Sequence, residues 1–420
     1  MNKVKTLPKI TLFESLLGMF CCFPFTLTSL RILQVAIIYG GSIFYLLLNS
    51  DILCKTALRR DTSRVSILLK ILILAICCLC VARNSCKDFG YFTFIGGVFR
   101  GFVLYLAYGI FILKRHDDFG FYDFCFLFIK NICWYVFFTL VLLIPAVRNF
   151  WKSIVYISEG NSDLVESIVY YTRFGLQGFS GYGQTICCSI AGLCFWMLKL
   201  RNYKISWFYF ALLFIGSACY GRVGLLANII LFGYFSVASI KFKKKKYVLL
   251  LIVGGVSLFV GLALYIEYFS SSYNAFSWML EPLVNLMKGN KQLSGSSSQL
   301  KKMYIFDFNS FTLLFGDVLY LDPNGNGYYR HTDVGFLRVM YYGGLILLLT
   351  YYVSQLIFLW GLFVNLKWSG KFLVFLGLLG LFAMFEAKGE SCYLIYKVFF
   401  VASLFVDNKR EERNGILVHN

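Results

Sequence analysis

The sequence predicts an all-helical integral membrane protein. Of its 420 residues, 59% are apolar and only 15% are charged, and the mean hydropathy is +0.70. The apolar residues gather in repeated runs of about 18 to 25, and each run is long enough to cross a bilayer core of about 30 Å as a helix. Composition and run length together exclude a soluble globular domain.

Window hydropathy predicts about twelve transmembrane helices in a single membrane domain that covers residues 1–420. The predicted spans lie near 11–29, 31–49, 65–82, 89–113, 121–146, 181–199, 205–220, 223–240, 247–268, 336–364, 372–387 and 391–406. No small-residue cleavage site follows the first span, so we expect it to stay as an anchor rather than to be removed as a signal peptide.

The basic residues of the short connections predict that both termini lie in the cytoplasm. Placing the N-terminus inside puts more than half of the 40 Lys and Arg residues on one side, namely Lys3, Lys5, Lys9, Lys55, Arg59, Arg60, Arg64, Lys114, Arg115, Lys199, Arg201, Lys204, the basic residues of 241–246, Lys367, Lys371, Lys409, Arg410 and Arg413. The positive-inside rule favours this orientation. Two longer loops, about 148–180 and 269–335, then lie on the outer face.

The net charge of +19 does not indicate nucleic acid as a partner. Its basic residues lie in short loops between apolar spans, where orientation and attraction to anionic lipid headgroups explain them. The fourteen cysteines fall mostly inside apolar runs and predict no metal site. Cys77 and Cys80 have CxxC spacing, but no second pair or histidine accompanies them. Cys86 and Cys392 lie near the outer face, and we expect no disulfide between them.

The second outer loop has internal organisation. Phe276, Leu280, Leu283 and Met287 recur at helical spacing and predict an amphipathic helix in the membrane interface. The segment 294–298, SGSSS, is typical of a flexible linker. Residues 303–317 are expected to form a partly buried helix or a re-entrant segment.

A polar, glycine-rich stretch from Phe315 to Leu345 ends this loop and enters the next span. It carries Arg330, His331 and Asp333, and Arg338 follows inside the apolar run. An arginine near the bilayer midplane costs about 2.5 to 3.5 kcal/mol on insertion scales, so such a residue normally faces a cavity, a partner or a ligand. Lys70 and Lys130 are close enough to cytoplasmic helix ends for their amines to reach the headgroups.

Further arginines are expected near the outer side or, for Arg100, in the middle of a span. Arg222 opens a span, Arg100 lies within one, and Arg173 precedes Gly175, Gly178, Gly181 and Gly183. These glycines either let backbone amides approach an anion or simply turn the chain into the next span. Acidic residues on this side are few, with Glu386 and Glu390 the nearest. We therefore expect several outer arginines to lack acidic partners and to bind a phosphate or diphosphate.

His331 is a candidate general base, because an imidazole can accept a proton near neutral pH and Asp333 could orient it. The alternative is a solvated loop histidine. The stretch 322–333 also matches part of a calcium loop, but Arg330 occupies its ninth position and the bidentate glutamate is missing. We therefore expect a tight Asn-Gly turn there. The chain has no Walker loop, Rossmann glycine pattern, GxSxG elbow or HExxH motif, so we expect no cofactor and a substrate that is already activated.

The sequence resembles the O-antigen polymerases of bacterial surface polysaccharide assembly, which are related to the O-antigen ligases. The resemblance covers the expected topology of most of the chain. Three segments carry it locally: RFGLQGFSGYG from Arg173, GRVGLLANII around Arg222 and HTDVGFLRVMYYGG from His331. The last resembles the family's polar-Asp-x-Gly segment with a glycine pair near the next span. The ligases usually carry His-Asn where this chain has HTDVG, which favours a polymerase.

The resemblance implies a metal-independent glycosyltransferase of the GT-C class in the bacterial inner membrane, with its two larger loops in the periplasm. Donor and acceptor would be undecaprenyl-diphosphate-linked glycans, and a chain-length regulator and a flippase of the same pathway would be partners. Arg173 and Arg222, with Arg338, would bind the donor diphosphate, and His331, oriented by Asp333, would accept the proton of the acceptor hydroxyl. Arg330 and Arg100 would be further substrate contacts.

Two alternatives stay open. A ligase that moves the glycan onto lipid A core would use almost the same groups. A lipid-linked oligosaccharide flippase also has about twelve spans, but it needs neither a large outer loop nor a general base, and the chain shows no duplicated halves.

Overall fold

The computed structural model describes residues 6–57, 61–157, 162–179, 181–242, 281, 284–285, 287–290, 295–324 and 327–406. These residues form two compact units. The first unit comprises Met1–Ile37, Tyr122–Ser298 and Leu376–Leu381, and the second comprises Ile38–Phe121, Gln299–Phe375 and Phe382–Asn420. The single membrane domain expected over 1–420 stays a prediction.

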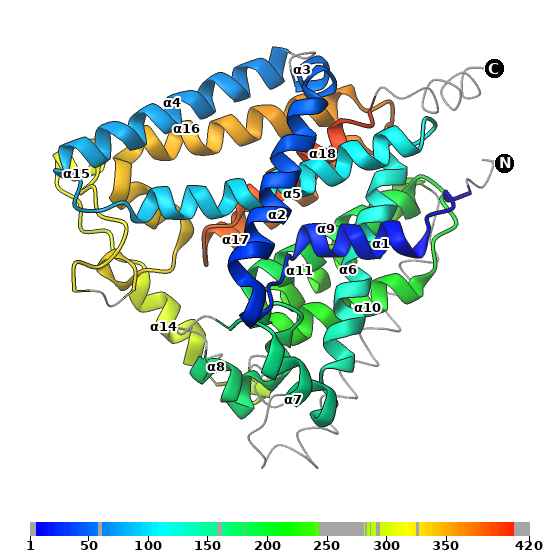
Figure 1. The fold of residues 1–420 in the computed structure, drawn as a ribbon. Coiled ribbons are helices and arrows are strands. Elements are labelled where there is room, and N and C mark those ends of the chain that lie inside the picture. The colour runs from blue at the N-terminus through cyan, green and yellow to red at the C-terminus, as the bar shows by residue number, and fades with distance from the viewer. Residues whose placement is uncertain are drawn as a thin grey trace. The chain divides into compact units, whose positions relative to one another are not determined.

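The chain is helical almost throughout its described residues (Figure 1). The elements up to the eleventh α-helix are α1 (Leu12–Cys22), η1 (Thr28–Leu30), α2 (Arg31–Leu48), α3 (Ser50–Ala57), α4 (Asp61–Arg83), α5 (Gly90–Arg115), α6 (Phe121–Val141), α7 (Pro145–Ile154), α8 (Ser162–Glu166), η3 (Ile168–Arg173), β1 (Phe174–Gly175), β2 (Gly178–Phe179), α9 (Tyr182–Leu200), α10 (Trp207–Tyr220) and α11 (Arg222–Ala238). The remaining elements are η4 (Ser239–Phe242), α14 (Gly295–Met303), α15 (Ser310–Phe315), η5 (Tyr329–His331), α16 (Gly335–Asn365), α17 (Lys371–Glu386) and α18 (Cys392–Ser403). Strands β1 and β2 pair as a short antiparallel hairpin.

Among the described residues, five helices are long and apolar enough to cross a membrane, which supports a membrane protein. They are Thr28–Leu48, Ser63–Arg83, Phe121–Val141, Tyr182–Leu200 and Gly335–Asn365. The full count of twelve spans, the type of membrane and the side of each terminus stay predictions. The predicted span near 247–268 lies outside the described residues, as do Phe276, Leu280 and Leu283 of the predicted amphipathic helix.

Two expectations of local structure were wrong. The first predicted span, 11–29, contains an α-helix that ends at Cys22, because Pro24 disfavours helical geometry at Phe23 and cannot continue the helix. The expected linker at 294–298 instead starts α14 at Gly295. Residues 303–317 contain the short helix α15, in which Thr312 is buried, and the re-entrant alternative stays a prediction.

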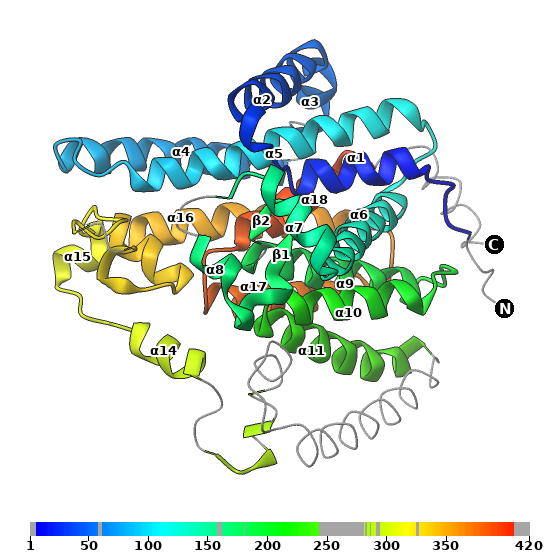
Figure 2. The ribbon, with the colours of Figure 1, turned by 60° about the horizontal axis from the view of Figure 1, so that its bottom comes forward.

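The core of the first unit is the trio α9, α10 and α11, which lie side by side (Figures 1 and 2). Buried polar side chains bind these helices together. Thr185 Oγ1 donates to the carbonyls of Ser217 (3.3 Å) and Gly221 (3.2 Å), and Asn228 Nδ2 donates to Ser217 Oγ (2.6 Å). A Cβ at Gly224 would lie 1.9 Å from Thr185 Oγ1, so this close approach requires glycine.

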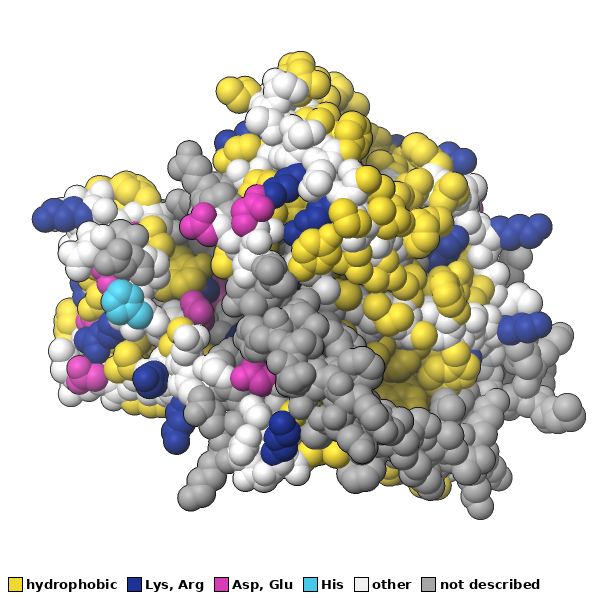
Figure 3. Space-filling view, turned by 90° about the horizontal axis from the view of Figure 1, so that it is seen from below, with side chains coloured by type: hydrophobic (Ala, Val, Ile, Leu, Met, Phe, Trp, Pro, Cys, Tyr) yellow, Lys and Arg dark blue, Asp and Glu magenta, His cyan; other side chains and the backbone are white. Residues whose placement is uncertain are grey.

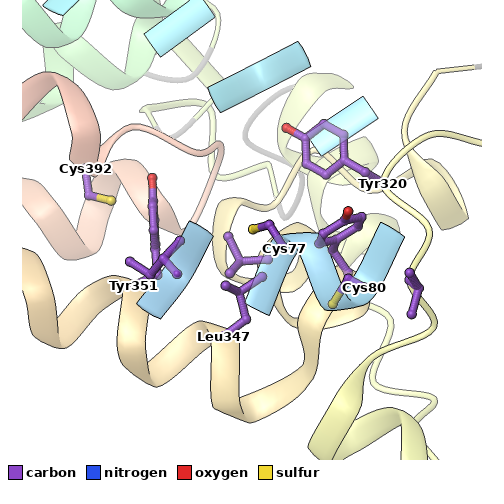
Figure 4. Close-up of a cluster of buried hydrophobic side chains, with 10 residues drawn as sticks. Cys77, Cys80, Tyr320, Leu347, Tyr351 and Cys392 are labelled. Carbon is purple, nitrogen blue, oxygen red and sulfur yellow. The ribbon is translucent and has the colours of Figure 1, made fainter. Parts of the chain in front are cut away.

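The core of the second unit forms where α4 packs along α16 (Figures 1 and 2). Figure 4 shows Cys77 and Leu347 between the rings of Tyr320 and Tyr351, with Cys392 pointing toward Tyr351. Nearer the N-terminus of α4, Lys70 Nζ lies 3.2 Å from Ser66 Oγ and 3.8 Å from the centroid of the Tyr396 ring. Lys70 therefore packs inward, and the expectation that it reaches the headgroups was wrong.

Candidate functional site

The polar stretch that begins at Phe315 is built onto a break in α16. Gly344 has φ 67° and ψ −167°, a conformation open to glycine and costly for other residues. The break frees the carbonyls of Tyr341 and Tyr342, which accept hydrogen bonds from Asp317 N (2.6 Å) and Val318 N (3.2 Å). A Cβ at Gly344 would lie 2.2 Å from the carbonyl oxygen of Leu314. Gly344, the second glycine of the pair at 343–344, therefore lets the loop pack against α16.

The connection between α4 and α5 holds the same loop from another side. Arg83 donates to the carbonyl of Gly316 (2.7 Å). The buried Asp88 accepts hydrogen bonds from Gly90 N (2.6 Å), Tyr320 N (2.8 Å) and Leu321 N (3.2 Å). Sequence reasoning missed Arg83 and Asp88, since nothing in their own neighbourhood indicates a partner more than 200 residues away.

Replacing Asp88 with alanine is expected to destabilise the second unit by roughly 3 kcal/mol, because three backbone N–H groups at a buried site lose their acceptor. Thermal unfolding of the detergent-solubilised protein measures the loss. Asp118→Ala, which removes an exposed carboxylate of the α5–α6 connection, is the matched control. Equal unfolding temperatures for the two variants would show that the hydrogen bonds of Asp88 do not stabilise the second unit.

Arg338 is the buried cation of this region and is 9% exposed. Its guanidinium lies over the ring of Tyr328 (3.5 Å to the centroid) and donates to the hydroxyl of Tyr320. The same hydroxyl donates to Glu390 Oε2 (3.2 Å), and Arg338 Nη2 lies 3.9 Å from that oxygen. The arginine is thus held by aromatic groups, with a carboxylate close by but beyond hydrogen-bonding distance.

Two buried carboxylates occupy the turn between α17 and α18. Glu386 Oε1 accepts from Ser391 N (2.6 Å), Ser391 Oγ (3.0 Å) and Cys392 N (2.6 Å), and its Oε2 accepts from Tyr352 Oη (2.5 Å). A Cβ at Gly335 would lie 2.5 Å from Glu386 Oε2 and 2.7 Å from Glu390 N. The glycine that follows Val334 therefore lets α16 begin directly against this turn.

His331 lies at the surface of the second unit, and its side chain is 68% exposed. Its Nε2 is 3.5 Å from Asp322 Oδ2. The pairing of His331 with Asp333 is not found among the described contacts, so Asp322 takes the place expected of Asp333. Arg330 and His331 both have positive φ, 54° and 53°, which is strained for residues other than glycine. In Figure 3 a histidine side chain is seen among acidic and basic side chains at one edge.

The chain turns back in front of His331, but both Asn-Gly pairs of the predicted tight turn include a residue outside the described ones, so that prediction stays a prediction. Asp322 Oδ1 accepts from Asn324 N (2.7 Å), and Leu321 bridges to Tyr328 in antiparallel fashion. Residues 325 and 326 lie outside the described part. Within the described ranges, no group of three or more His, Cys, Asp or Glu side chains is placed to hold a metal ion.

The expectation that several outer arginines lack acidic partners was wrong for Arg222 and Arg330. Arg222 pairs with Glu281 (2.6 Å), Arg330 pairs with Asp307 (3.2 Å) and Asp317 (3.6 Å), and Arg338 has Glu390 nearby. The acidic partners of Arg222 and Arg330 come from loop segments, where hydropathy gives no information about contacts. Arg100 lies in α5, and its side chain is outside the described ones.

Arg173 and Arg222 belong to one corner of the first unit. Arg173 ends η3 and Arg222 begins α11, and the neighbouring Thr172 Oγ1 donates to the carbonyl of Cys219 (3.1 Å). Gly178 has φ 84° in the β1–β2 turn. The amide of Gly181, which precedes α9, donates to Gln184 Oε1 (2.8 Å). Turn and helix formation thus account for these two glycines.

Arg148 is a residue of this corner that the sequence did not single out. It is buried and donates to the carbonyls of Tyr171 (2.8 Å) and Val165 (2.9 Å), and its guanidinium lies over the Tyr171 ring. Arg148 therefore fixes the segment that leads to Arg173.

Comparison of the chain with protein-family models, curated proteins and solved structures finds no match.

Proposed function

We propose that this chain is a glycosyltransferase of the O-antigen polymerase kind, which transfers a lipid-diphosphate-linked glycan onto a second lipid-linked repeat unit. Arg338 carries the proposal: it is a buried guanidinium at the start of an apolar helix, beside a polar loop, with aromatic rings holding it in place. A planar guanidinium in such surroundings suits a phosphate oxygen, and a membrane-embedded substrate explains its position.

Both substrates of this reaction carry a diphosphate, so more than one group of arginines is needed to bind them. Arg173 and Arg222 would bind one diphosphate in the first unit, and Arg338 would bind an anionic group in the second. When the acceptor hydroxyl attacks the anomeric carbon, the bond from that carbon to the diphosphate oxygen breaks. The electron pair stays on the diphosphate, where arginine charge offsets it. The anomeric centre is inverted by this single displacement.

The hydroxyl proton would pass to His331, whose exposure lets it release the proton to water. Asp322 would orient the imidazole. Asp333 would act nearby, and Arg330 and Arg100 stay proposed substrate contacts. Each step uses side chains of this chain and an already activated donor.

Purified protein incubated in EDTA with synthetic lipid-diphosphate repeat units tests the proposal. We expect elongation without added metal, and His331→Ala is expected to slow it by about 100-fold, in the range typical of a lost general base. His116→Ala is the matched control, because His116 lies in the α5–α6 connection, where its ring packs against Phe119. A folded wild-type protein that forms no product would refute the proposal.

A gene deletion separates the alternatives on a gel of lipopolysaccharide. Core bearing a single repeat indicates a polymerase, whereas bare core indicates a ligase. A flippase would be indicated if the deletion strain no longer exposed the repeat unit in the periplasm while the His331→Ala and Arg173→Ala strains kept intact chain-length ladders.

A further inference from the structure

Lys397 is a buried lysine that the proposed mechanism does not use. It lies in the middle of α18, five residues after Cys392 begins the helix, and it is 5% exposed. A lysine within an apolar helix of a membrane protein normally faces a cavity, pairs with another group or marks the path of a substrate, because its charge is costly there. The amine of Lys397 therefore needs a group that accepts its hydrogen bonds.

The described contacts of Lys397 provide no such acceptor. Its Nζ lies 5.6 Å from the centroid of the Tyr105 ring, near the outer limit of a cation–π contact. Within the described residues, the amine makes no hydrogen bond and no ion pair. A buried donor left without an acceptor is unfavourable whether the amine is charged or neutral.

Other lysines in the apolar helices do find acceptors. Lys70 Nζ of α4 lies 3.2 Å from Ser66 Oγ, and Lys130 Nζ of α6 donates to the carbonyl of Ile10 (3.1 Å). Both acceptors are neutral groups of the chain itself. The lack of an acceptor at Lys397 is thus a property of its position and not of the lysines in these helices generally.

The amine of Lys397 lies beside a glycine of α5. A Cβ added to Gly101 would lie 3.9 Å from Lys397 Nζ, and it would meet no other described atom of a neighbouring helix within 4 Å. Gly101 lies near the middle of α5 and is partly exposed. The space between Gly101 and the amine is therefore open, and a further atom can enter it without displacing a side chain.

Loose packing between α5 and α18 does not explain this space. Further along α5, a Cβ at Gly109 would lie 2.3 Å from Val401 Cγ1, so the two helices approach each other closely there. The Phe102 ring stacks on the Tyr396 ring, with centroids 6.2 Å apart. The two helices are thus well packed on either side, and the space beside the amine is a local feature.

The charges of these two helices suit an anion. Neither α5 nor α18 contains an acidic residue, and both carry basic ones. Arg100, which is already proposed as a substrate contact, immediately precedes Gly101, so its backbone borders the same space. The pair of helices is therefore complementary in charge to a phosphate and not to a cation.

We propose that Lys397 binds the phosphate group of a lipid in the space beside Gly101. A phosphate oxygen would accept the hydrogen bonds that the described chain leaves unmade, and it would compensate the buried charge. A free anion would lose its hydration between apolar helices, whereas a lipid has an apolar chain that favours this environment. The open space then has an occupant that fits both its size and its charge.

The phosphate can come from two sources. The proposed function supplies a polyprenyl diphosphate, the part that donor and acceptor share, and the bilayer supplies phospholipids with the same group. Identification of the ligand as a polyprenyl diphosphate rests on the proposed function, and Lys397 would then be a further substrate-binding residue. The presence of the phosphate site does not depend on glycan transfer.

Thermal unfolding of the purified full-length protein, titrated with a synthetic polyprenyl diphosphate, tests this site. A ligand of the folded state raises the unfolding temperature more when it binds more tightly. We expect Lys397→Met, which keeps the length of the side chain but removes the amine, to weaken the affinity about tenfold. Without lipid this variant should be at least as stable as the wild type, because an unsatisfied buried donor is lost. Lys114→Met, at the exposed end of α5, is the matched control.

Gly101→Leu tests the space without changing the amine. Its side chain would occupy the space, so we expect a comparable loss of affinity while Lys397 stays in place. Gly40→Leu is the matched control, because Gly40 also lies in an apolar helix, α2, and a Cβ there would meet no described atom within 4 Å. Unchanged affinity in Lys397→Met and Gly101→Leu overturns the proposal. Equal stabilisation by the corresponding polyprenol, which lacks phosphate, also overturns it.

Phosphatidylglycerol distinguishes the two sources. A loss in Lys397→Met that is larger for the polyprenyl diphosphate indicates the substrate, and an equal loss for both lipids indicates a phospholipid of the bilayer. If lipid affinity depends on Lys397 while wild-type protein elongates no glycan, the proposed function fails and the phosphate site stands. If glycan is elongated but lipid affinity does not depend on Lys397, the site fails and the proposed function stands.

Discussion

Replacing Gly344 with alanine is expected to destabilise the second unit by roughly 3 kcal/mol or more. Its backbone conformation, φ 67° and ψ −167°, is costly for any residue with a Cβ. The added carbon would also lie 2.2 Å from the carbonyl oxygen of Leu314 and 2.4 Å from Phe315 N. Because both obstacles are backbone atoms, a side-chain rotation cannot relieve the clash, and the loop must leave α16.

Thermal unfolding in detergent measures this effect, and limited proteolysis shows whether the loop has been released. Gly380→Ala is the matched control, because Gly380 also lies within an apolar helix, α17, and a Cβ added there would meet no atom of the described residues within 4 Å. Alanine is the better helix former there, so its effect should be neutral or slightly stabilising. A Gly344→Ala protein as stable as the control would show that the break in α16 is not required.

Replacing Arg338 with glutamine is expected to lower the rate of glycan elongation about 100-fold, the cost of losing one group that offsets charge in a transition state. The fold should survive at pH 7, because burial raises the pKa of Glu390 to about 8 and the lost contacts with the Tyr328 ring and the Tyr320 hydroxyl are worth about 1–2 kcal/mol. Above pH 8 the wild type gains the attraction between ionised Glu390 and Arg338, so the variant becomes relatively less stable as pH rises.

Elongation assays and thermal unfolding between pH 6 and pH 9 check both parts. Arg115→Gln removes an exposed arginine at the end of α5 and serves as the control. Glu390→Gln combined with Arg338→Gln should remove the stability difference above pH 8 but not recover elongation. Full activity in Arg338→Gln would exclude this arginine from the reaction.

Hydropathy located the long helices closely because each one must be continuously apolar. The predicted spans 181–199 and 336–364 differ by one residue at each end from α9, Tyr182–Leu200, and α16, Gly335–Asn365. The same measure cannot detect a break such as that at Gly344, since glycine is compatible with an apolar run and φ leaves no mark on composition. It also overestimated the first span, where Pro24 rather than polarity ends α1.

The arginines and the histidine could be chosen from the sequence because charge is conspicuous in an apolar chain. The residues that pair with them could not be predicted from the sequence. Asp88 reaches Tyr320 across 232 positions, and such pairings depend on how helices pack. Glu386 and Glu390 were noticed as the few acids near the outer side, but the hydrogen bonds from the first amides of α18 to Glu386 and the burial of both residues depend on how this turn packs. Asp322, rather than Asp333, lies by His331 because Leu321 pairs with Tyr328 in antiparallel fashion.

The break in α16 also joins the loop and the helix into one cooperative element. Two carbonyls of the first helical segment are capped by amides of Asp317 and Val318, and the same loop is bonded through Tyr320 to Asp88. Opening the loop would therefore leave helix carbonyls and loop amides unsatisfied at once, at sites shielded from water. Amide hydrogens on both sides of the break should exchange together, at a rate set by the stability of the second unit rather than by local fraying.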